Sequence, residues 1–346
     1  MQKTMMRLND REKQILKAVI QEFIDTAVPV GSAQISQKSS IDLKPASVRR
    51  IMATLEEKGL LTHPHTSAGR VPTSLGYRIY VNELLKKSKL TEHQEKLINQ
   101  TIDAYDGDVQ LFMSKVSAVL AKISRQVGII VTPKFYEAVL ERIHLIPVSS
   151  TRVMVILAVK DQQVRTILVE VNHPVDKEDL HRLARKINRR FYGKTLREIK
   201  NSYPHLMSDL KSEKSGLVRF FSRTADRIFD FSRYENYWLH GTNYLMHQPE
   251  FNDVQRVSGL IQVLEDKDHI FHFMEKREQP PGIKITIGRE NELAEMRDCS
   301  VITSTYKVGD IWGVVGIIGP MRLRYQKVIP VVEFMASAIT RKLGMA

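Results

Sequence analysis

The sequence predicts an α+β, multidomain protein, and three observations support this fold class. Helical periodicity dominates residues 9–58 and 73–125, β-rich runs lie between 141 and 171, and a second group of strands lies between 283 and 318. The strands do not alternate with helices as βαβ units would, and no short repeat is detectable. The 346 residues are enough for two or three domains, each with its own core.

Three helical patterns and a hairpin fill the N-terminal segment. Their expected bounds are 9–26, 32–39 and 45–58 for the helices, and 60–63 with 71 onward for the hairpin strands. Asn9 is a favourable N-cap, Pro45 suits the first turn of the third helix, and Gly59 is a natural left-handed residue after its end. Helix, helix, helix and hairpin in this order predict a winged helix-turn-helix DNA-binding domain over residues 1–88.

The third helix carries the candidate DNA-binding residues. At about 100° per residue, one side holds an apolar stripe that must face a core, formed by Val48, Ile51, Met52 and Leu55. The opposite side carries arginines and small or hydroxyl residues, which suit a major groove. We expect DNA contacts from Lys44, Ser47, Arg49, Arg50 and Thr54, and from Ser67 and Arg70 in the hairpin turn. A surface helix with solvated arginines has the same composition, but the hairpin that follows favours DNA binding.

The rest of the chain mixes helices and strands, with a domain boundary expected at Lys86–Lys89. Further helices are expected over 73–85, 91–105, 108–125, 176–232 and 323–343. Strands are expected over 141–147, 151–159, 163–171, 283–287, 300–306 and 310–318. Lys160 to Gln162 read as a short hairpin turn between two of these strands.

The charge of the chain indicates a polyanionic partner. The formal net charge is +13 and the pI about 9.6. Residues 1–88 hold 14 Lys and Arg against 8 Asp and Glu, and residues 177–233 hold 15 against 7, so these two segments contain the excess. Such a local excess is typical of nucleic-acid binding and, second, of binding to a membrane surface, although a solvated helix face also produces it.

Several other classes of protein are excluded by the pattern. The apolar runs are too short to span a membrane, and no secretory signal is recognisable, so we expect a cytoplasmic protein. Cys299 is the single cysteine and is expected to be a buried packing thiol. No Walker loop, HExxH or GxSxG motif is present, so we expect no enzyme, no catalytic residues, no metal site and no cofactor.

Several collinear motifs resemble the family of heat-inducible transcription repressors named HrcA. The most specific stretch is Pro64 to Thr73 (PHTSAGRVPT). The other matching residues are Pro29–Ser32, Pro45–Arg49, Leu55, Glu56, Gly59–Leu61, Gly76–Arg78, Tyr80, Pro249–Phe251, Asp253, Ile287, Gly288, Glu290, Asn291, Cys299–Val301, Gly316–Pro320, Arg322 and Tyr325. The resemblance therefore covers nearly the whole chain.

The resemblance implies a dimeric repressor of chaperone operons of the groE and dnaK type. Such a repressor binds double-stranded DNA at an inverted-repeat operator called CIRCE, and the GroE chaperonin, a GroEL-type partner, maintains its activity. The resemblance also implies a GAF-like domain, mapped here to 89–137 and 234–346, and an inserted dimerising domain of three strands and helices, mapped to 138–233. An alternative left open is a metabolite-responsive winged-helix regulator that uses the GAF-like domain as its ligand sensor.

Two departures from the family pattern stand out. Lys44 occupies the position where the family usually has Ser or Thr, so a side-chain N-cap is lost before Pro45. The usual residues around Arg322 are replaced by Met321, Leu323 and Arg324, which leaves the role of this loop open.

Overall fold

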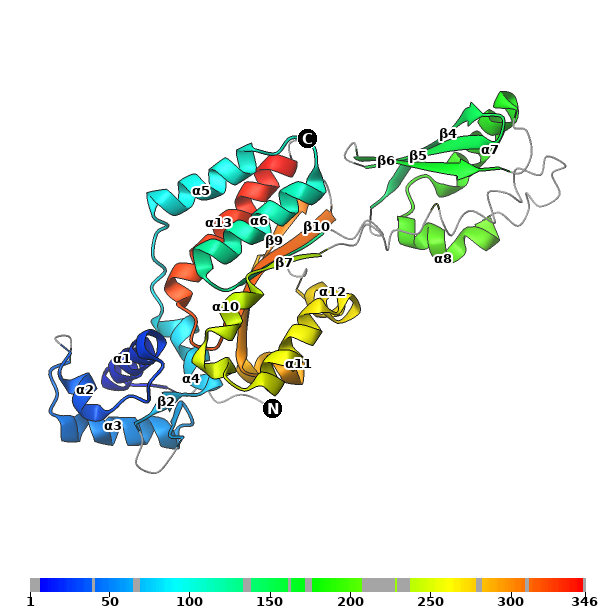
Figure 1. Cartoon of the computed structure of the whole chain (residues 1–346). Helices are drawn as coiled ribbons and strands as arrows, with labels where there is room; N and C mark the ends of the chain where they lie inside the picture. Colours follow the sequence, from blue (N-terminus) through cyan, green and yellow to red (C-terminus); the bar gives the residue numbers. More distant parts are fainter. Residues whose placement is uncertain are drawn as a thin grey trace. The chain divides into compact units, whose positions relative to one another are not determined.

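A computed structural model of the chain shows two compact units (Figure 1). It describes residues 7–38, 41–64, 69–132, 138–160, 163–171, 176–206, 228, 237–277, 282–308 and 311–344. The first unit comprises residues 1–130, 238–304 and 315–336, and the second comprises 131–237, 305–314 and 337–346. The expected insertion at 138–233 lies within the second unit, and the expected boundary near residue 88 lies within the first. Both remain predictions.

The N-terminal part of the first unit, which we call the head (residues 7–85), contains the expected helices and hairpin. Its elements are α1 (Asp10–Thr26), α2 (Ser32–Ser36), α3 (Pro45–Glu57), β1 (Leu61–Thr62), β2 (Val71–Pro72), α4 (Ser74–Ile79) and one π-helical turn, η1 (Tyr80–Leu84). β1 and β2 pair antiparallel, with Leu61 opposite Pro72. Asn9 caps α1 in a capping box with Glu12, as the sequence predicts for Asn9.

The remainder of the first unit, which we call the body, is a sheet with helices. The elements there, some of which continue into the second unit, are α5 (Glu92–Asp103), α6 (Val109–Ser124), β3 (Val127–Val131), β7 (Tyr237–His240), α10 (Thr242–Met246), η4 (Pro249–Phe251), α11 (Val254–Glu265), α12 (Lys267–Glu275), β8 (Ile283–Ile287), η5 (Gly288–Glu290), η6 (Ala294–Met296), β9 (Cys299–Val308), β10 (Ile311–Pro320) and α13 (Tyr325–Leu343). The five strands are ordered β7-β3-β10-β9-β8, and β8 pairs antiparallel with β9.

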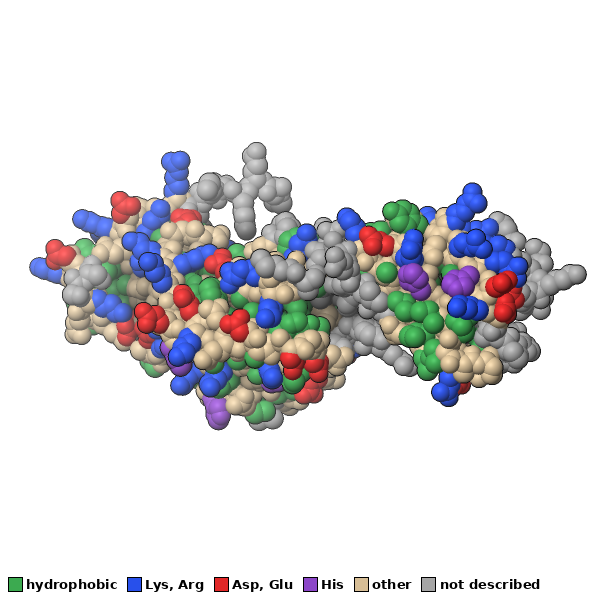
Figure 2. Space-filling model, turned by 90° about the horizontal axis from the view of Figure 1, so that it is seen from above, with side chains coloured by type: hydrophobic (Ala, Val, Ile, Leu, Met, Phe, Trp, Pro, Cys, Tyr) green, Lys and Arg blue, Asp and Glu red, His purple; other side chains and the backbone are tan. Residues whose placement is uncertain are grey.

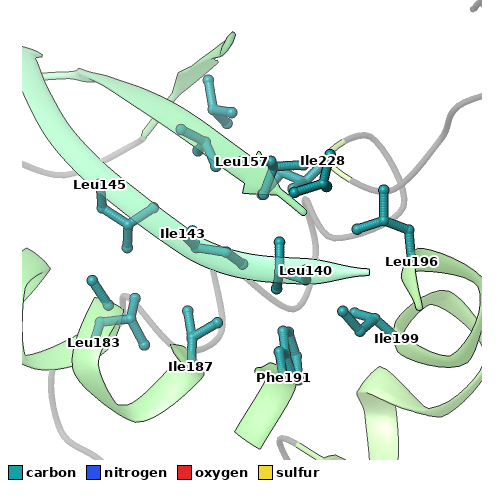
Figure 3. Packing of buried hydrophobic residues seen from close by; sticks show 14 of the residues in the cluster. Leu140, Ile143, Leu145, Leu157, Leu183, Ile187, Phe191, Leu196, Ile199 and Ile228 are labelled. Carbon is teal, nitrogen blue, oxygen red and sulfur yellow. The ribbon is translucent and has the colours of Figure 1, made fainter. Parts of the chain in front are cut away.

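The second unit is built on an antiparallel three-stranded sheet. The strands β4 (Leu140–Ser149), β5 (Arg152–Val159) and β6 (Gln163–Glu170) follow one another in the sheet, and the helices are α7 (Lys177–Phe191) and α8 (Leu196–Leu206). Side chains on one face of the sheet pack with Leu183, Ile187 and Phe191 of α7 (Figure 3). Asn188 fastens α7 to β4, because its amide donates to the Ile143 carbonyl at 2.8 Å and accepts from the Ile143 N–H at 2.7 Å.

The opposite face of this sheet exposes apolar side chains. Ile146, Met154 and Leu168 are direct neighbours across β4, β5 and β6, and the side chains at the two ends of this row are 41% and 50% exposed. Val148 in β4 is also exposed. Figure 2 shows hydrophobic side chains between His, Lys and Arg on the part of the surface formed by this unit. An apolar row of this kind on a sheet is typical of a surface that is covered by a partner.

The body contains elements that the sequence analysis does not predict. The strands β3 and β7 and the helices α10, α11 and α12 are absent from the expected elements. All five residues of β3 are buried, so the segment lacks the alternation that marks a half-buried strand. Short, fully apolar runs are compatible with either a strand or a buried helix, and only pairing with a neighbour decides between them.

A partly buried ion pair joins α1 to the end of α3. The Lys58 ammonium lies 2.7 Å from Oε1 of Glu12, whose side chain is 8% exposed. Burial by itself raises the pKa of Glu12, but the hydrogen bonds from Lys58 and from the Asn9 N–H outweigh it and leave the pKa below its usual value. The ionised form of Glu12 therefore stabilises the folded head.

We expect the stability of the head to depend on the ionisation of Glu12. Because folding lowers the pKa of Glu12, its contribution is present above the pKa of the unfolded chain and is lost as the pH falls through the lower pKa of the folded head. Glu12→Gln should cost about 1–2 kcal/mol at pH 7, since it weakens hydrogen bonds to a charged group. Scanning calorimetry at pH 7 and at low pH measures both effects. If the difference in stability between the wild type and Glu12→Gln does not shrink at low pH, the stabilising role of ionised Glu12 is contradicted.

Candidate nucleic-acid interface

The orientation of α3 is set by its buried side. Val48, Met52 and Leu55 are at most 3% exposed and face the core of the head, as the sequence predicts, whereas Ile51, the fourth residue of the predicted stripe, is only half-buried. The facing part of α1 is equally buried, with Ile15, Leu16, Val19 and Ile20 fully inaccessible. Because one stripe of α3 is committed to this core, the residues opposite the stripe must point to solvent.

The exposed side of α3 presents the cations expected from the sequence. Arg49, Arg50, Ser47 and Lys44 are exposed, whereas Thr54 is half-buried and donates its hydroxyl to the Arg50 carbonyl at 3.3 Å. Within the described part of the chain, neither arginine nor Lys44 forms an ion pair. Exposed guanidinium groups without a carboxylate partner are available to an external anion.

The first turn of α3 lacks a side-chain cap. Lys44 is the N-cap residue in an extended conformation, and its side chain makes no capping hydrogen bond. The loss of the cap that the sequence analysis infers is thus confirmed. Pro45 follows at the first helical position, where its missing N–H costs nothing. The start of α3 therefore presents an exposed ammonium group in place of a capping hydroxyl.

Arg70 is held by the head itself. Its Nε lies 2.7 Å from Oε2 of Glu56 in α3, and its backbone pairs with Val30 through two hydrogen bonds of 2.8 and 2.9 Å. Glu56 also contacts the ring of His63, the residue that follows β1. The Arg70 side chain is 24% exposed, so it reaches the surface as part of an ion pair. Ser67, the other hairpin candidate, lies outside the described residues.

A cleft brings Arg49 and Arg70 together. It has a volume of about 320 Å³ and is lined by Val30, Gly31, Ser32, Ala33, Arg49, Met52, Gly69 and Arg70. The place of Gly31 and Ser32 beside the two arginines is not predicted from the sequence. The signal that could have pointed there is the cluster of family-like residues at Pro29–Ser32.

Gly69 explains why the hairpin returns so close to the segment before α2. A Cβ atom at this position would lie 2.6 Å from the carbonyl carbon and oxygen of Val30, closer than real Cβ contacts. Only a glycine permits this approach between two backbones. The approach also allows Arg70 to pair with Val30 and places its guanidinium at the cleft.

Other kinds of site are not apparent in the described residues. No group of three His, Cys, Asp or Glu side chains among them could hold a metal ion. None of the helices described there is long and apolar enough to cross a membrane. Cys299 is fully buried, and burial raises the pKa of its thiol to about 12, as expected of a packing residue.

Comparisons with known proteins agree over nearly the whole chain. The family model described as HrcA protein C terminal domain matches residues 110–329. The heat-inducible transcription repressor HrcA of Chlorobium phaeobacteroides (strain BS1) is 34% identical over 97% of this chain and 99% of its own length. The protein of the same name from Desulfitobacterium hafniense (strain DSM 10664 / DCB-2) is 31% identical over 98% of each chain. A solved structure described as a hypothetical protein at 2.2 Å resolution matches 98% of this chain with a TM-score of 0.60 at 20% identity, which supports the fold.

These relatives define the class of the protein as a transcription repressor of the heat-shock response. Identity above 30% over almost the full length of both chains leaves the family assignment clear. The chain belongs to the HrcA family, as the motifs of the sequence indicate.

Proposed function

We propose that the protein represses chaperone operons of the groE and dnaK type by binding DNA through its head, a winged helix-turn-helix. The observation that carries this proposal is the exposed side of α3, where Arg49 and Arg50 have no ion-pair partner among the described residues. The operator is the inverted repeat CIRCE, and the protein acts in the cytoplasm as a homodimer. The relatives are heat-inducible repressors, which favours this function over a metabolite-responsive regulator.

The two arginines of α3 have different roles in this proposal. At about 100° per residue, Arg50 lies nearly opposite the buried stripe. Ser47 and Thr54 lie within about 60° of Arg50 around the helix. This group of three suits the bases of the major groove, where Arg bonds guanine and hydroxyls bond either base or phosphate. Arg49 lies on the other flank and lines the cleft with Arg70, where a backbone phosphate fits.

Substitution of each arginine separates the two roles. Arg50→Ala should weaken operator binding by about 1–3 kcal/mol and leave binding to random DNA nearly unchanged, because it removes a bidentate contact to a base. Arg49→Ala should weaken binding to the operator and to random DNA alike. It should also lower the slope of log affinity against log salt concentration by about 1, because it removes a phosphate contact. Fluorescence anisotropy with operator and scrambled duplexes at several salt concentrations measures this. Equal losses on both duplexes for Arg50→Ala would make it a phosphate contact, and no loss would remove it from the interface.

The dimer is formed in this proposal by the exposed face of the three-stranded sheet. An inverted-repeat operator requires two heads related by a two-fold axis, and an isologous interface provides this axis. The row Ile146, Met154 and Leu168 supplies an apolar centre for such an interface. Burial of this row in a second copy would remove its side chains from water, which is the main driving force of association.

Leu168→Lys should raise the dissociation constant of the dimer by about tenfold or more, because a charge replaces apolar area at the centre of the contact. Tyr192→Lys is the matched control, since Tyr192 is 72% exposed in the same unit and follows α7 rather than lying on the sheet. Sedimentation equilibrium at several concentrations measures the constant. An unchanged dimer in Leu168→Lys, or equal dissociation in the control, would place the interface elsewhere.

The chaperonin maintains the active repressor in this proposal. Purified protein heated in the absence of chaperonin should lose operator binding irreversibly, and a GroEL-type chaperonin with ATP should restore most of it. Operator binding before heating, after heating and after chaperonin treatment measures this sequence. If binding instead falls on heating and returns on cooling without chaperonin, the protein is a direct thermometer and the chaperonin role is refuted.

A further inference from the structure

Several family-like motifs that are far apart in the sequence meet where the head contacts the body. The head contributes the run Gly76–Arg78 in α4, and the body contributes η4, η5 and the loop from Pro320 to Tyr325. The DNA-binding residues of α3 take no part in these contacts. The contacts comprise two clusters, each centred on an arginine, and one aromatic contact. All three join the head to the body.

Arg322 in the body binds the end of α1 in the head. Its Nη1 donates to the Ile24 carbonyl at 3.4 Å, its Nη2 donates to Oε1 of Gln248 at 2.7 Å, and its Nε pairs with Oε1 of Glu250. The Arg322 side chain is only 15% exposed. The last carbonyls of a helix lack partners within the helix and favour a nearby positive charge. Since the last turn of α1 has no basic residue of its own, Arg322 supplies this charge from 298 residues away.

Arg78 makes the reciprocal contact from the head to the body. Its Nε donates to Oε1 of Glu290 at 2.8 Å, and its Nη2 donates to the Ile285 carbonyl at 2.7 Å and also pairs with Oε2 of Glu290. Glu290 accepts the Ile287 N–H at 3.0 Å, which fixes the carboxylate on η5. A bidentate arginine–carboxylate pair restricts orientation as well as distance.

An aromatic contact lies at the same junction. The rings of Tyr77 in α4 and Tyr325 at the start of α13 are 6.1 Å apart, and both side chains are at most 1% exposed. Tyr325 donates its hydroxyl to the Met321 carbonyl at 2.7 Å, within the loop that contains Arg322. Ring contacts of this kind add packing specificity to the polar contacts.

We propose that Arg322 and Arg78 are positioning residues that hold the head at a set angle on the body, so that the dimer recognises the spacing of its two half-sites. This inference rests on the proposed function, since it presupposes a dimer on an inverted repeat. A flexible head would bind each half-site equally well but would tolerate altered spacing. A held head binds both half-sites together only when their separation matches the dimer.

The protein offers a matched control at the same junction. Arg324 pairs with Asp25 at 3.2 Å and joins the same loop to the same helix, but the two side chains are 56% and 64% exposed. Exposed ion pairs of this kind contribute little, whereas removing one partner of a buried pair is strongly destabilising. The substitutions Arg322→Gln and Arg324→Gln therefore lie in the same loop. They differ in how buried the arginine side chain is and in how it bonds to α1.

The first test compares operators of different geometry with the full-length dimer. Affinities are measured for the operator, for an operator with about half a helical turn inserted between its half-sites, and for a single half-site. Arg322→Gln should reduce the preference for the natural spacing by about tenfold or more while half-site affinity stays within about twofold. Arg324→Gln should behave as wild type. Unchanged spacing preference in Arg322→Gln, or an equal fall in half-site affinity, would overturn the proposal.

The second test needs no DNA and separates failure of the positioning role from failure of the proposed function. Probes are attached through Arg11→Cys in α1 and Ser258→Cys in α11, both exposed positions, and Cys299 stays unlabelled because it is buried. The distribution of probe distances should broaden in Arg322→Gln and stay narrow in Arg324→Gln. If Arg322→Gln does not fold, Glu250→Gln removes the charge of its partner and should broaden the distribution in the same way. A narrow distribution in the folded variant would overturn the positioning role. A wild-type protein that does not distinguish the operator from other DNA would refute the proposed function and with it the recognition of spacing, but the probe distances would still show whether Arg322 holds the head on the body.

Discussion

Burial of one stripe of α3 against α1 is the constraint on which the rest of the head depends. Val48, Met52 and Leu55 enter the core together, and this single commitment turns Arg49 and Arg50 to solvent. The ion pair between Lys58 and Glu12 then holds the C-terminal end of α3 on α1. The orientation of the candidate DNA-binding face is therefore a consequence of packing at the back of the helix, and the exposed residues contribute nothing to it.

The distribution of partners among the cations is more informative than the net charge of +13. Lys58, Arg78 and Arg322 are bound to carboxylates, and they join helices or join the head to the body. In the second unit, Arg182 on the exposed side of α7 pairs with Asp179, which agrees with a solvated helix face. Among the described residues of α3, by contrast, the arginines have no carboxylate partner. Two of the exposed cations left available to an anion, Arg49 and Arg50, thus lie where the proposed function requires them.

Sequence patterns predicted the elements of the head and of the three-stranded sheet, in which one face is buried and the other is exposed, and also the almost wholly buried strands β9 and β10. The helices and hairpin of the head and the strands β4, β5 and β6 have this alternation, and their expected positions agree with the structure. The strand β3 and the helices between residues 242 and 275 were not predicted. β3 is buried throughout, and β9 and β10 almost throughout, but β3 has 5 residues where each of them has 10, so its short apolar run does not distinguish a strand from a buried helix and its identity depends on its neighbours in the sheet.

The sequence by itself determined the family, the exposed side of α3 and the candidates Arg49 and Arg50, because these follow from local order and helical periodicity. Only the tertiary structure decided the partners of the other arginines. Arg70 meets Glu56 because Gly69 lets two backbones approach, and Arg322 meets the end of α1 because the chain returns there after 298 residues. A periodic pattern reports which side of a helix is buried, but it holds no information on which distant residue lies opposite.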